Sequence, residues 1–410
     1  MRSVNGSLPE PHRLRVGFLT AEYPGDGTCG GLGTAIRQIV HALAELGHEA
    51  NVLLCGNLPM FGDSDGVVPL YHLQPPALIA GLPAPLGRGP SLWLGRELAQ
   101  LAAKLRLDVL EAPDCGGLSA FLDVFKTAGI LSVVRLHTGT AVLRRVDNLK
   151  PNRLADWLER RAIESADLVT ANSLATIERT RAVLGIRRQD IHVLPNPVAP
   201  PFFDLPETNG PGDPLVVFHG RLQWAKGPDV LARAIPAILQ HHPATRFRLI
   251  GEDSATAPGN GCMLNHVRGL LPPSVAGQVE FTGYVEPGEV PLRLADATLC
   301  VFPSRWEGFG IACAEAMGCG KPVVVSEALR ELVEHGLTGL CVPIGDADAL
   351  ANAVCILLSD RSLSQELGRC ARQKARRLFH PKVVAEATAQ LYTTALGRKH
   401  LHCQTIAAGT

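Results

Sequence analysis

The chain has 410 residues, of which 46% are hydrophobic and 19% are charged, so it is long enough to bury the cores of two or three domains. Lysine plus arginine and aspartate plus glutamate number 39 each, which excludes a global charge that would attract nucleic acid or an anionic membrane. The 11 cysteines show no CxxC pair and no metal-ligand spacing, which indicates a reducing compartment.

The beginning of the chain, residues 1–13, has no apolar stretch that could serve as a signal peptide. No other run approaches the roughly 18 apolar residues of a membrane-spanning helix. We therefore expect a soluble protein located in the cytoplasm.

The first half of the chain alternates short β-rich runs with longer helical patterns. Strands are predicted at residues 14–20, 50–55, 108–112, 131–137, 168–172 and 191–195. Several of these runs are apolar without alternation, which is typical of parallel strands covered on both faces. Residues 34–49 and 153–167 place apolar side chains on one stripe of a helix, and Gly47 is a suitable C-cap for the first of these helices.

Residues 195–214 contain seven prolines and interrupt the alternation, which predicts a stiff connector rather than part of a core. The alternation then restarts. Strands are predicted at 215–219, 246–251, 279–283, 299–302, 322–325 and 339–342, with helices around 228–241, 288–296, 311–318, 346–358, 362–378 and 382–397.

This order of elements predicts an α/β protein with two doubly wound, Rossmann-like domains that face a central cleft. The predicted parts are a first domain (1–195), a proline-rich linker (196–214), a second domain (215–380), and a C-terminal helix and tail (381–410). We expect the C-terminal helix to pack back on the first domain. Ligands of such sheets bind at the carboxyl ends of the strands, so the cleft is the expected site.

The first candidate site is the segment EYPGDGTCGGLGTAIRQI (22–39), which follows a strand and leads into a helix. Its glycines, among them Gly30 and Gly31, expose backbone N–H groups at the helix N-terminus, which suits a phosphate. The segment is neither a GxGxxG fingerprint nor a Walker loop. By itself it fits an ordinary tight turn equally well.

The second candidate is HGRLQWAKGPDVL (219–231), at the corresponding place in the second domain. Arg221 and Lys226 fall just past a strand, where two cations can grip one diphosphate. The alternative, that both are solvated loop residues, would be preferred if the pair stood alone.

The third candidate is SRWEGFGIACAEAMGCGKPVVV (304–325), which carries Glu307 in a loop and Glu315 one turn into the following helix. This spacing is too wide for two acids that share a proton, but it suits two different hydroxyl-bearing parts of one ligand. An ordinary surface pair of glutamates would not explain the Gly-Phe-Gly between them, which allows close approach of a ligand to the backbone.

The segment Glu307-GFGIACA-Glu315 resembles the E-x7-E motif of retaining glycosyltransferases with the GT-B fold, in particular those of family 4. Other segments resemble the same family in the same order over roughly residues 14–360. They are AEYPGDGTCGGLGTA, SVVRLHTG, ADLVTANS, LPNPV, HGRLQWAKG, FTGYV and GKPVVVSEALRELVEHGLTGLCVP.

The resemblance implies an acceptor-binding first domain and a donor-binding second domain. Arg221 and Lys226 would bind the donor diphosphate. Glu307 would hold the transferred sugar, Glu315 the ribose hydroxyls, and Val285 would frame the base. The other implied donor contacts are Gly30 and Gly31 on the diphosphate, and the backbone of Phe309, Gly310 and Ile311 on the sugar.

His137 ends a predicted strand, and a histidine in such a place is more often structural than functional. Its position facing the predicted cleft favours a functional role. The resemblance implies that it contacts a hydroxyl of the reacting sugar or the acceptor, and that the catalytic residues are Glu307, His137, Arg221 and Lys226. The segment EAPDCGGL (111–118) is a departure from the family pattern with no assigned role.

The function implied is transfer of a hexosyl unit from a nucleotide-diphosphate sugar to a hydroxyl acceptor, which is a glycan, a lipid-linked molecule or a small molecule. The acceptor would attack the face from which the diphosphate leaves, with retention, and the diphosphate itself would take the acceptor proton. The donor is a substrate, so no cofactor is expected. The sequence carries no signal for an oligomeric state.

Two Asp-x-Asp pairs raise the alternative of a metal-dependent enzyme. Asp63 and Asp65 lie in a Gly-rich turn, and Asp346 and Asp348 open a predicted helix, where they fit N-capping. We expect no metal site, because two acids in a loop are a weak signal for one.

Three other hypotheses stay open. The same fold serves sugar-nucleotide epimerases, and a non-catalytic sugar-nucleotide binding protein would need the same donor contacts. Residues 142–164 hold six basic and four acidic side chains, so weak peripheral contact with a membrane is a third possibility. Ordinary packing of the Leu154, Trp157 and Leu158 face is favoured over it, because the excess charge is small.

Overall fold

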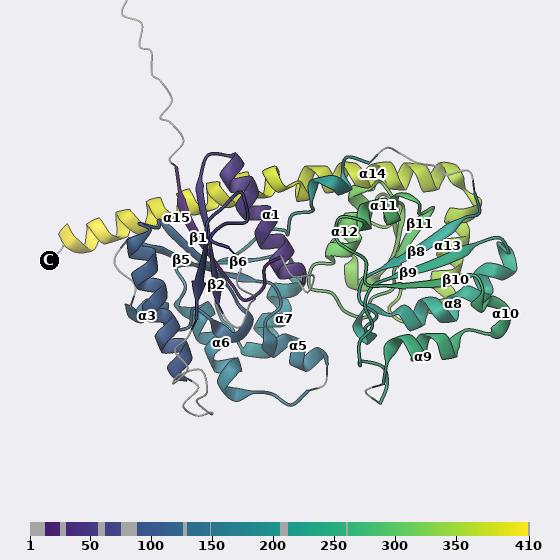
Figure 1. Cartoon of the computed structure of the whole chain (residues 1–410), viewed down its shortest axis with the longest axis horizontal. Helices are drawn as coiled ribbons and strands as arrows, with labels where there is room; N and C mark the ends of the chain where they lie inside the picture. The colour runs from purple at the N-terminus through teal and green to yellow at the C-terminus, as the bar shows by residue number, and fades with distance from the viewer. Residues whose placement is uncertain are drawn as a thin grey trace, which may run out of the picture.

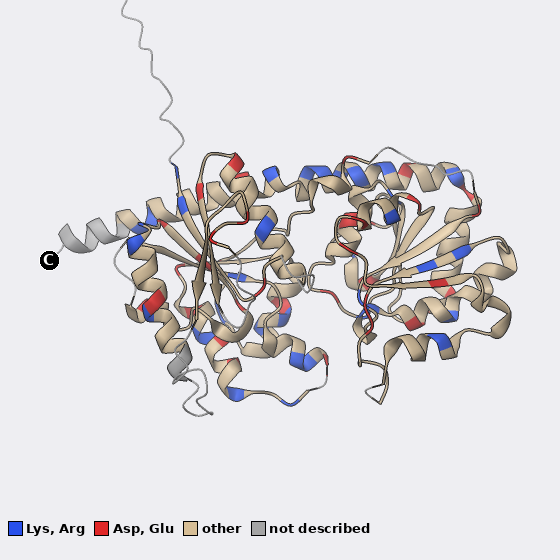
Figure 2. Ribbon diagram, in the orientation of Figure 1, with Lys and Arg blue, Asp and Glu red and all other residues tan. Residues whose placement is uncertain are grey.

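The computed structural model describes residues 13–24, 30–55, 62–74, 88–125, 129–147, 149–205, 212–259 and 261–408. These residues form two α/β lobes side by side, each built on one parallel sheet (Figure 1). Figure 2 shows Lys and Arg interspersed with Asp and Glu over both lobes, as the balanced composition predicts.

The first lobe contains, within the described residues, a seven-stranded sheet in the order β3-β2-β1-β4-β5-β6-β7. Its strands are β1 (Arg15–Thr20), β2 (Glu49–Cys55), β3 (Leu70–Leu73), β4 (Val109–Pro113), β5 (Leu131–Leu136), β6 (Leu168–Ala171) and β7 (Ile191–Val193). The six predicted strands are confirmed. The edge strand β3 was not predicted, because its four residues include two half-buried polar-tipped side chains and make no apolar run.

Helices cover both faces of this sheet. They are α1 (Gly31–Glu45), α3 (Arg88–Lys104), α4 (Leu122–Phe125), α5 (Thr140–Val146), α6 (Arg153–Ser165) and α7 (Leu174–Leu184). The stripe predicted for α1 is buried, and Gly47 has a φ of +84° just after the helix ends. Neither α3 nor α7 was predicted, because α3 opens with Gly89-Pro90 and α7 has only 11 residues.

The second lobe contains, among the described residues, a six-stranded parallel sheet in the order β10-β9-β8-β11-β12-β13. Its strands are β8 (Leu215–His219), β9 (Arg246–Ile250), β10 (Val279–Gly283), β11 (Leu299–Phe302), β12 (Val323–Ser326) and β13 (Leu340–Val342). All six match predicted strands to within one residue at each end. These strands can be recognised in the sequence because a parallel strand buried on both faces is a short continuous run of apolar residues.

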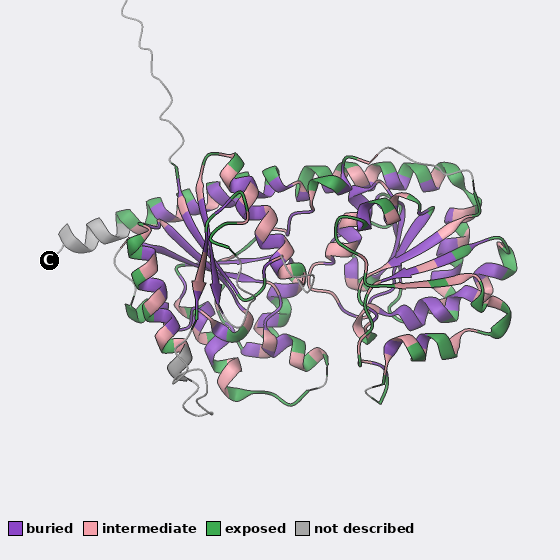
Figure 3. Ribbon diagram, in the orientation of Figure 1, coloured by how far each residue is buried: buried purple, intermediate pink, exposed green. Residues whose placement is uncertain are grey.

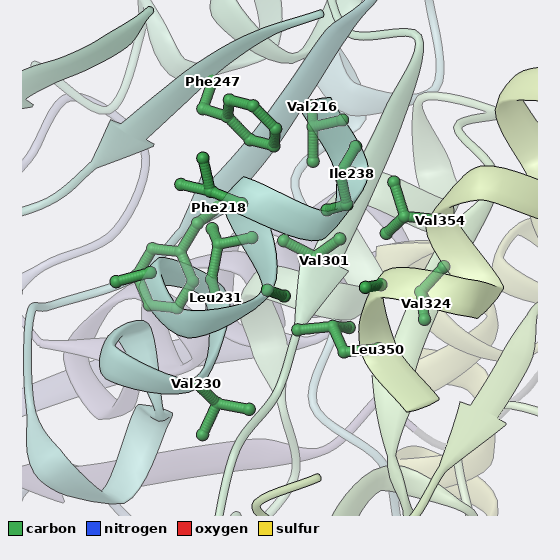
Figure 4. Packing of buried hydrophobic residues seen from close by; sticks show 14 of the residues in the cluster. Val216, Phe218, Val230, Leu231, Ile238, Phe247, Val301, Val324, Leu350 and Val354 are labelled. Atoms are coloured by element: carbon green, nitrogen blue, oxygen red, sulfur yellow. The ribbon is translucent and has the colours of Figure 1, made fainter. Parts of the chain in front are cut away.

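The helices of this lobe are α8 (Pro228–His241), α9 (Met263–Leu270), α10 (Pro273–Ala276), α11 (Val290–Ala295), α12 (Ile311–Gly318), α13 (Ala347–Ser359) and α14 (Arg361–Phe379). One apolar core lies between the sheet and the helices α8 and α13 (Figure 4). It brings together Ile238 of α8, Val301 of β11 and Val354 of α13, all of them fully buried.

The first part of the connector, residues 198–205, packs in the second lobe's core, contrary to the prediction; residues 206–211 lie outside the described residues. Val198, Phe202 and Phe203 belong to a buried cluster with β11, β12 and α12. The backbone N–H of Val198 donates to the carbonyl of Phe379 at 2.8 Å, and the guanidinium of Arg372 donates to the carbonyl of Phe203 at 2.6 Å. The prediction failed because proline excludes regular hydrogen bonding but does not prevent the apolar residues beside it from being buried.

The last helix, α15 (Pro381–Ala408), leaves the second lobe and runs along the first (Figure 1). Val384, Ala389 and Tyr392 enter the core of the first lobe, where α15 packs against α1. Lys399 Nζ lies 2.6 Å from a carboxylate oxygen of Asp167. Figure 3 shows buried residues along the face of α15 that meets this lobe. Of the helices described, none is long and apolar enough to cross a membrane.

Candidate functional site

The loop that joins β11 to α12 in the second lobe lies against the carboxyl ends of β5 and β6 in the first. The Ser173 hydroxyl, just past β6, donates to the carbonyl of Gly308 at 2.6 Å. A Cβ atom on Gly308 would lie 2.4 Å from Oγ1 of Thr138, so a larger residue would displace that side chain. The two sheets thus meet through the strand ends at which doubly wound folds bind ligands.

Glu307 is held by two side chains of its own lobe. Its Oε2 lies 2.7 Å from Lys226 Nζ, and its Oε1 accepts a hydrogen bond from Ser304 Oγ at 3.1 Å. The Glu307 side chain is 10% exposed and that of Lys226 is 27% exposed, so both charged groups keep a path to solvent. The structure therefore brings together two residues that were predicted to act on the same donor.

Close backbone packing sets the position of Lys226, which ends a 3-10 turn (Trp224–Lys226). The next residue, Gly227, has a φ of +68°, and a Cβ there would lie 2.1 Å from the carbonyl oxygen of Pro303. The backbone N–H of Arg305 donates to the carbonyl of Ala225 at 2.7 Å. Only glycine permits this approach, so the loop after β8 and the loop after β11 form one unit.

Glu315 lies on α12, which begins at Ile311 as predicted. Its Oε2 is 3.0 Å from Nε2 of His219, the last residue of β8. Before the helix, Gly310 has a φ of +87°, and a Cβ there would lie 2.3 Å from a methyl carbon of Leu329. Glu307 and Glu315 thus have separate partners, as the spacing predicts for acids that hold different parts of a ligand.

The remaining predicted donor residues of the second lobe surround the same loop. Arg221 is exposed and has no ion-pair partner among the residues that the structure describes. Val285, Phe309 and Ile311 are half-buried and pack against one apolar cluster. The rings of Phe309 and Phe379 meet edge to face, with centroids 5.4 Å apart.

The first lobe presents the start of α1 to this loop. Gly31 is the first residue of the helix, and a Cβ there would lie 3.6 Å from a methyl carbon of Ile311. A Cβ on Gly30 would lie 2.8 Å from a carboxylate oxygen of Glu22. Residues 25–29 of the predicted phosphate loop lie outside the described residues. The two glycines nevertheless lie opposite the loop that carries Glu307.

His137 follows β5 and is half-buried beside the same contact. Burial, with a further contribution from the positive charge of Arg135, lowers the pKa of the His137 imidazole to about 3. The ring is therefore neutral at physiological pH and offers one donor and one acceptor nitrogen. Its backbone N–H donates to Oδ1 of Asp114 at 3.0 Å.

The segment EAPDCGGL, which had no predicted role, packs beside the turn at His137, whose backbone N–H bonds to Asp114 of this segment. Glu159 of α6 accepts hydrogen bonds from the backbone N–H groups of Gly116 and Thr140, each at 2.8 Å. Gly117 has a φ of +61°, and a Cβ there would lie 2.4 Å from the carbonyl carbon of Leu158. An aspartate just after an apolar strand was the one sequence signal for this arrangement, but its partners lie on other elements.

Asp114 and Glu159 place two buried carboxyl groups beside this turn. A Cβ on Gly139 would lie 2.7 Å from Oε2 of Glu159 and 3.2 Å from Oδ2 of Asp114. Oδ2 of Asp114 has no hydrogen-bond partner among the described residues. Burial and the neighbouring Glu159 charge raise the pKa of Asp114 to about 7, although the His137 N–H opposes this shift.

We expect Asp114→Asn to reduce the pH dependence of stability. The pKa of Asp114 rises from an ordinary 3.8 to about 7 on folding, so its proton stabilises the folded state fully below about pH 4. That stabilisation is lost as the pH rises through 7. Between pH 5 and pH 8 the wild type should lose about 2–3 kcal/mol of unfolding free energy that the variant does not lose.

Urea unfolding at several pH values measures this difference, and Asp63→Asn, at an exposed aspartate, is the matched control. The control should follow the wild-type pH profile. Parallel profiles for Asp114→Asn and the wild type would contradict a raised pKa at this carboxyl group.

Both Asp-x-Asp pairs make local structural contacts. Asp65 accepts hydrogen bonds from the Tyr23 hydroxyl at 2.5 Å and lies 2.7 Å from Nε2 of His41. Burial would raise the pKa of Asp65, but the bonds from Tyr23 and from nearby backbone N–H groups lower it overall. Asp346 caps α13 through the N–H of Ala349 at 2.8 Å, as predicted. Within the described residues there is no group of three or more His, Cys, Asp or Glu that could hold a metal ion.

The basic segment at α5 and α6 packs largely on its own lobe. Leu158 is buried and Leu154 is half-buried, whereas the Trp157 side chain is 40% exposed. The ring of Trp157 lies 6.0 Å from that of Phe121, and the guanidinium of Arg161 lies over Phe121. The packing of this face therefore accounts for most of its apolar residues.

Two families together match most of the chain. Residues 29–200 match Glycosyltransferase Family 4, and residues 213–360 match Glycosyl transferases group 1. A D-inositol 3-phosphate glycosyltransferase of Acidothermus cellulolyticus is 30% identical, over 92% of this chain and 88% of its own. A glycogen synthase of Mycobacterium tuberculosis is 29% identical, over 93% of this chain and 95% of its own.

Solved structures resemble the whole chain. Sucrose-phosphate synthase from Thermosynechococcus elongatus has a TM-score of 0.74 at 23% identity, covering 94% of this chain and 100% of that chain. Anabaena HepE in complex with UDP-glucose has a TM-score of 0.67 at 21% identity, covering 93% of this chain and 100% of that chain. This protein is therefore a glycosyltransferase of the group 1, family 4 type, with the GT-B fold.

Proposed function

We propose that this enzyme transfers a hexosyl unit from a nucleotide-diphosphate sugar to a hydroxyl acceptor, with retention of anomeric configuration and without a bound metal ion. The observation that carries the proposal is the 2.7 Å contact between Lys226 and Glu307. It joins a cation suited to a diphosphate with an acid suited to a sugar, in a loop that meets the other lobe.

The chemistry requires that negative charge on the leaving diphosphate be neutralised as the glycosidic bond breaks. Lys226 and the exposed Arg221 supply positive charge on one side. The N–H groups at the start of α1, at Gly30 and Gly31, supply a helix dipole on the other. Groups held in this way before the donor binds would stabilise the transition state without reorganisation.

The two acids give the donor its orientation. Glu307 accepts hydrogen bonds from hydroxyls of the transferred sugar, and Glu315 accepts them from the ribose. Val285 and the backbone from Phe309 to Ile311 would border the base and the sugar. The neutral His137 imidazole can contact a sugar or acceptor hydroxyl without adding a positive charge to the site.

Retention follows if the acceptor attacks from the side of the leaving diphosphate, which then takes the acceptor proton. Contact between the lobes would exclude the water that otherwise hydrolyses the donor. The described cysteines are all free thiols, which supports a reducing, cytoplasmic location.

A donor screen tests the proposal. Thermal unfolding would be followed with UDP-, GDP-, ADP- and dTDP-sugars, and we expect at least one of them to raise the Tm. UDP-glucose comes first, because the similar HepE structure contains it. With the best donor and a panel of hydroxyl acceptors, mass spectrometry should detect the glycoside, and NMR should show the donor's anomeric configuration.

Each alternative predicts a different result in the same assay. An epimerase would convert the donor sugar, or release the nucleotide diphosphate, with no acceptor present. A binding protein would raise its Tm with a donor but give no turnover with any acceptor of the panel. Loss of transfer on treatment with EDTA would contradict the metal-independent part of the proposal.

A further inference from the structure

Helix α7 of the first lobe, together with Ser173 that caps it, makes three contacts with the second lobe. Ser173 caps α7 by accepting from the N–H of Thr176 at 3.0 Å, and its hydroxyl donates to the carbonyl of Gly308 at 2.6 Å. Both Ser173 and Thr176 are buried. Further along the helix, the guanidinium of Arg179 lies 5.5 Å from the ring centroid of Trp306.

The third contact is made by Glu331, which follows β12 in the second lobe. Its Oε1 accepts from the N–H of Leu174 at 2.8 Å, and its Oε2 accepts from the N–H of Ala175 at 3.1 Å. These are the first two residues of α7, whose N–H groups have no partner within the helix. A carboxylate there also interacts favourably with the helix dipole. One lobe thus caps a helix of the other.

The contact with Gly308 is one peptide away from Glu307. A hydrogen bond to the Gly308 carbonyl fixes the plane of the peptide that follows, and with it the direction of the loop that carries the Glu307 side chain. Oγ1 of Thr138 occupies the space that a Cβ on Gly308 would need, and Thr138 has a φ of +99°, a conformation that costs a non-glycine residue free energy. The first lobe therefore contacts this loop through both Ser173 and Thr138.

We propose that Ser173 and Glu331 are positioning residues, which align Glu307 with the donor sugar only when the two lobes are in contact. This inference rests on the proposed transfer reaction. It adds that contact between the two lobes regulates that reaction. When the lobes separate, Gly308 loses its partners from the first lobe and Glu331 loses the amides of α7. The donor can still bind the second lobe, but Glu307 is no longer held for transfer.

The test compares Ser173→Ala, Glu331→Gln and the double variant with the wild type. Donor affinity, measured by calorimetry with the donor found in the screen, should fall by a smaller factor than kcat, because most of the proposed donor contacts lie on the second lobe. The kcat should fall at least about tenfold in the double variant, which corresponds to about 1.4 kcal/mol of activation free energy. Ser173→Thr keeps the hydroxyl and should restore most of the activity.

Two controls separate positioning from stability. Asn152→Ala removes the N-cap of α6, which accepts from Ala155 N–H at 3.2 Å and has no hydrogen bond to the second lobe among the described residues. Glu334→Gln breaks the Lys374 ion pair within the second lobe. Both controls should keep the wild-type kcat at a temperature well below their Tm. A kcat loss in the controls equal to that in the double variant would overturn the inference.

Small-angle scattering provides a readout that does not depend on turnover. The radius of gyration of the double variant should exceed that of the wild type, both with and without donor, and Asn152→Ala should not differ from the wild type. If the wild type gives no transfer at all, the proposed function fails. The scattering result alone then tests whether Ser173 and Glu331 hold the two lobes together. Equal radii of gyration in the wild type and the double variant would refute the role of Ser173 and Glu331.

Discussion

Lys226→Ala is expected to lower kcat/KM at least about a hundredfold while leaving the fold intact, which is the scale of losing one preorganised group that stabilises transition-state charge. Two consequences combine. The leaving diphosphate loses a cation, and the carboxylate of Glu307 loses its partner at 2.7 Å. Arg221→Ala should cause a loss of the same order, because Arg221 is exposed and free to grip the same group.

Steady-state kinetics with the best donor measure these effects, and circular dichroism checks that the fold is retained. Arg293→Ala is the matched control, since Arg293 of α11 makes an exposed ion pair with Glu289, the residue just before that helix in the same lobe. The control should stay within about twofold of the wild type, as expected of a surface ion pair. Wild-type rates in both Lys226→Ala and Arg221→Ala would remove the diphosphate assignment.

Arg135→Met is expected to lower the free energy of unfolding by about 3–5 kcal/mol, the scale of removing one partner of a buried ion pair. Arg135 of β5 is fully buried, and its Nε lies 3.0 Å from Oε1 of Glu111 of β4. The hydroxyl of Tyr392, on α15, donates to the other oxygen of Glu111. Without Arg135, the Glu111 carboxylate would stay buried with a neutral partner only.

Arg160→Met is the control for this change, because Arg160 pairs with Glu164 at 3.0 Å on the exposed face of α6. Its effect should stay below about 1 kcal/mol. Urea unfolding of the two variants gives the comparison. A loss of less than about 1 kcal/mol for Arg135→Met would show that the buried group is hydrated or that its neighbours rearrange.

The prediction for Arg135 also concerns the site. Arg135 lies two residues before His137 on the same strand, and its charge contributes to the low pKa of that imidazole. The buried pair therefore connects the C-terminal helix, through Tyr392, to the strand that carries His137. Arg135 thus affects both the stability of the core, through its ion pair with Glu111, and the protonation state of the His137 imidazole.

Most elements that carry the site could be predicted from local sequence. Twelve of the strands and the start of α12 follow from apolar runs and glycines within a few residues, because neighbouring residues share one secondary structure. The acids at 307 and 315 were found in the same way. The short edge strand β3 and the core role of Phe203 were missed, since both depend on packing against distant segments.

The order of strands and helices follows from local sequence, as does the placement of two acids and two cations just after strands. Two contacts depend on tertiary packing: Ser173 donates to the carbonyl of Gly308, 135 residues away, and Tyr392 donates to Glu111, 281 residues away. The spacing of apolar residues along a helix or strand indicates which face of that element is buried. It does not indicate which distant polar group the element contacts, because that depends on how the complete lobes pack together.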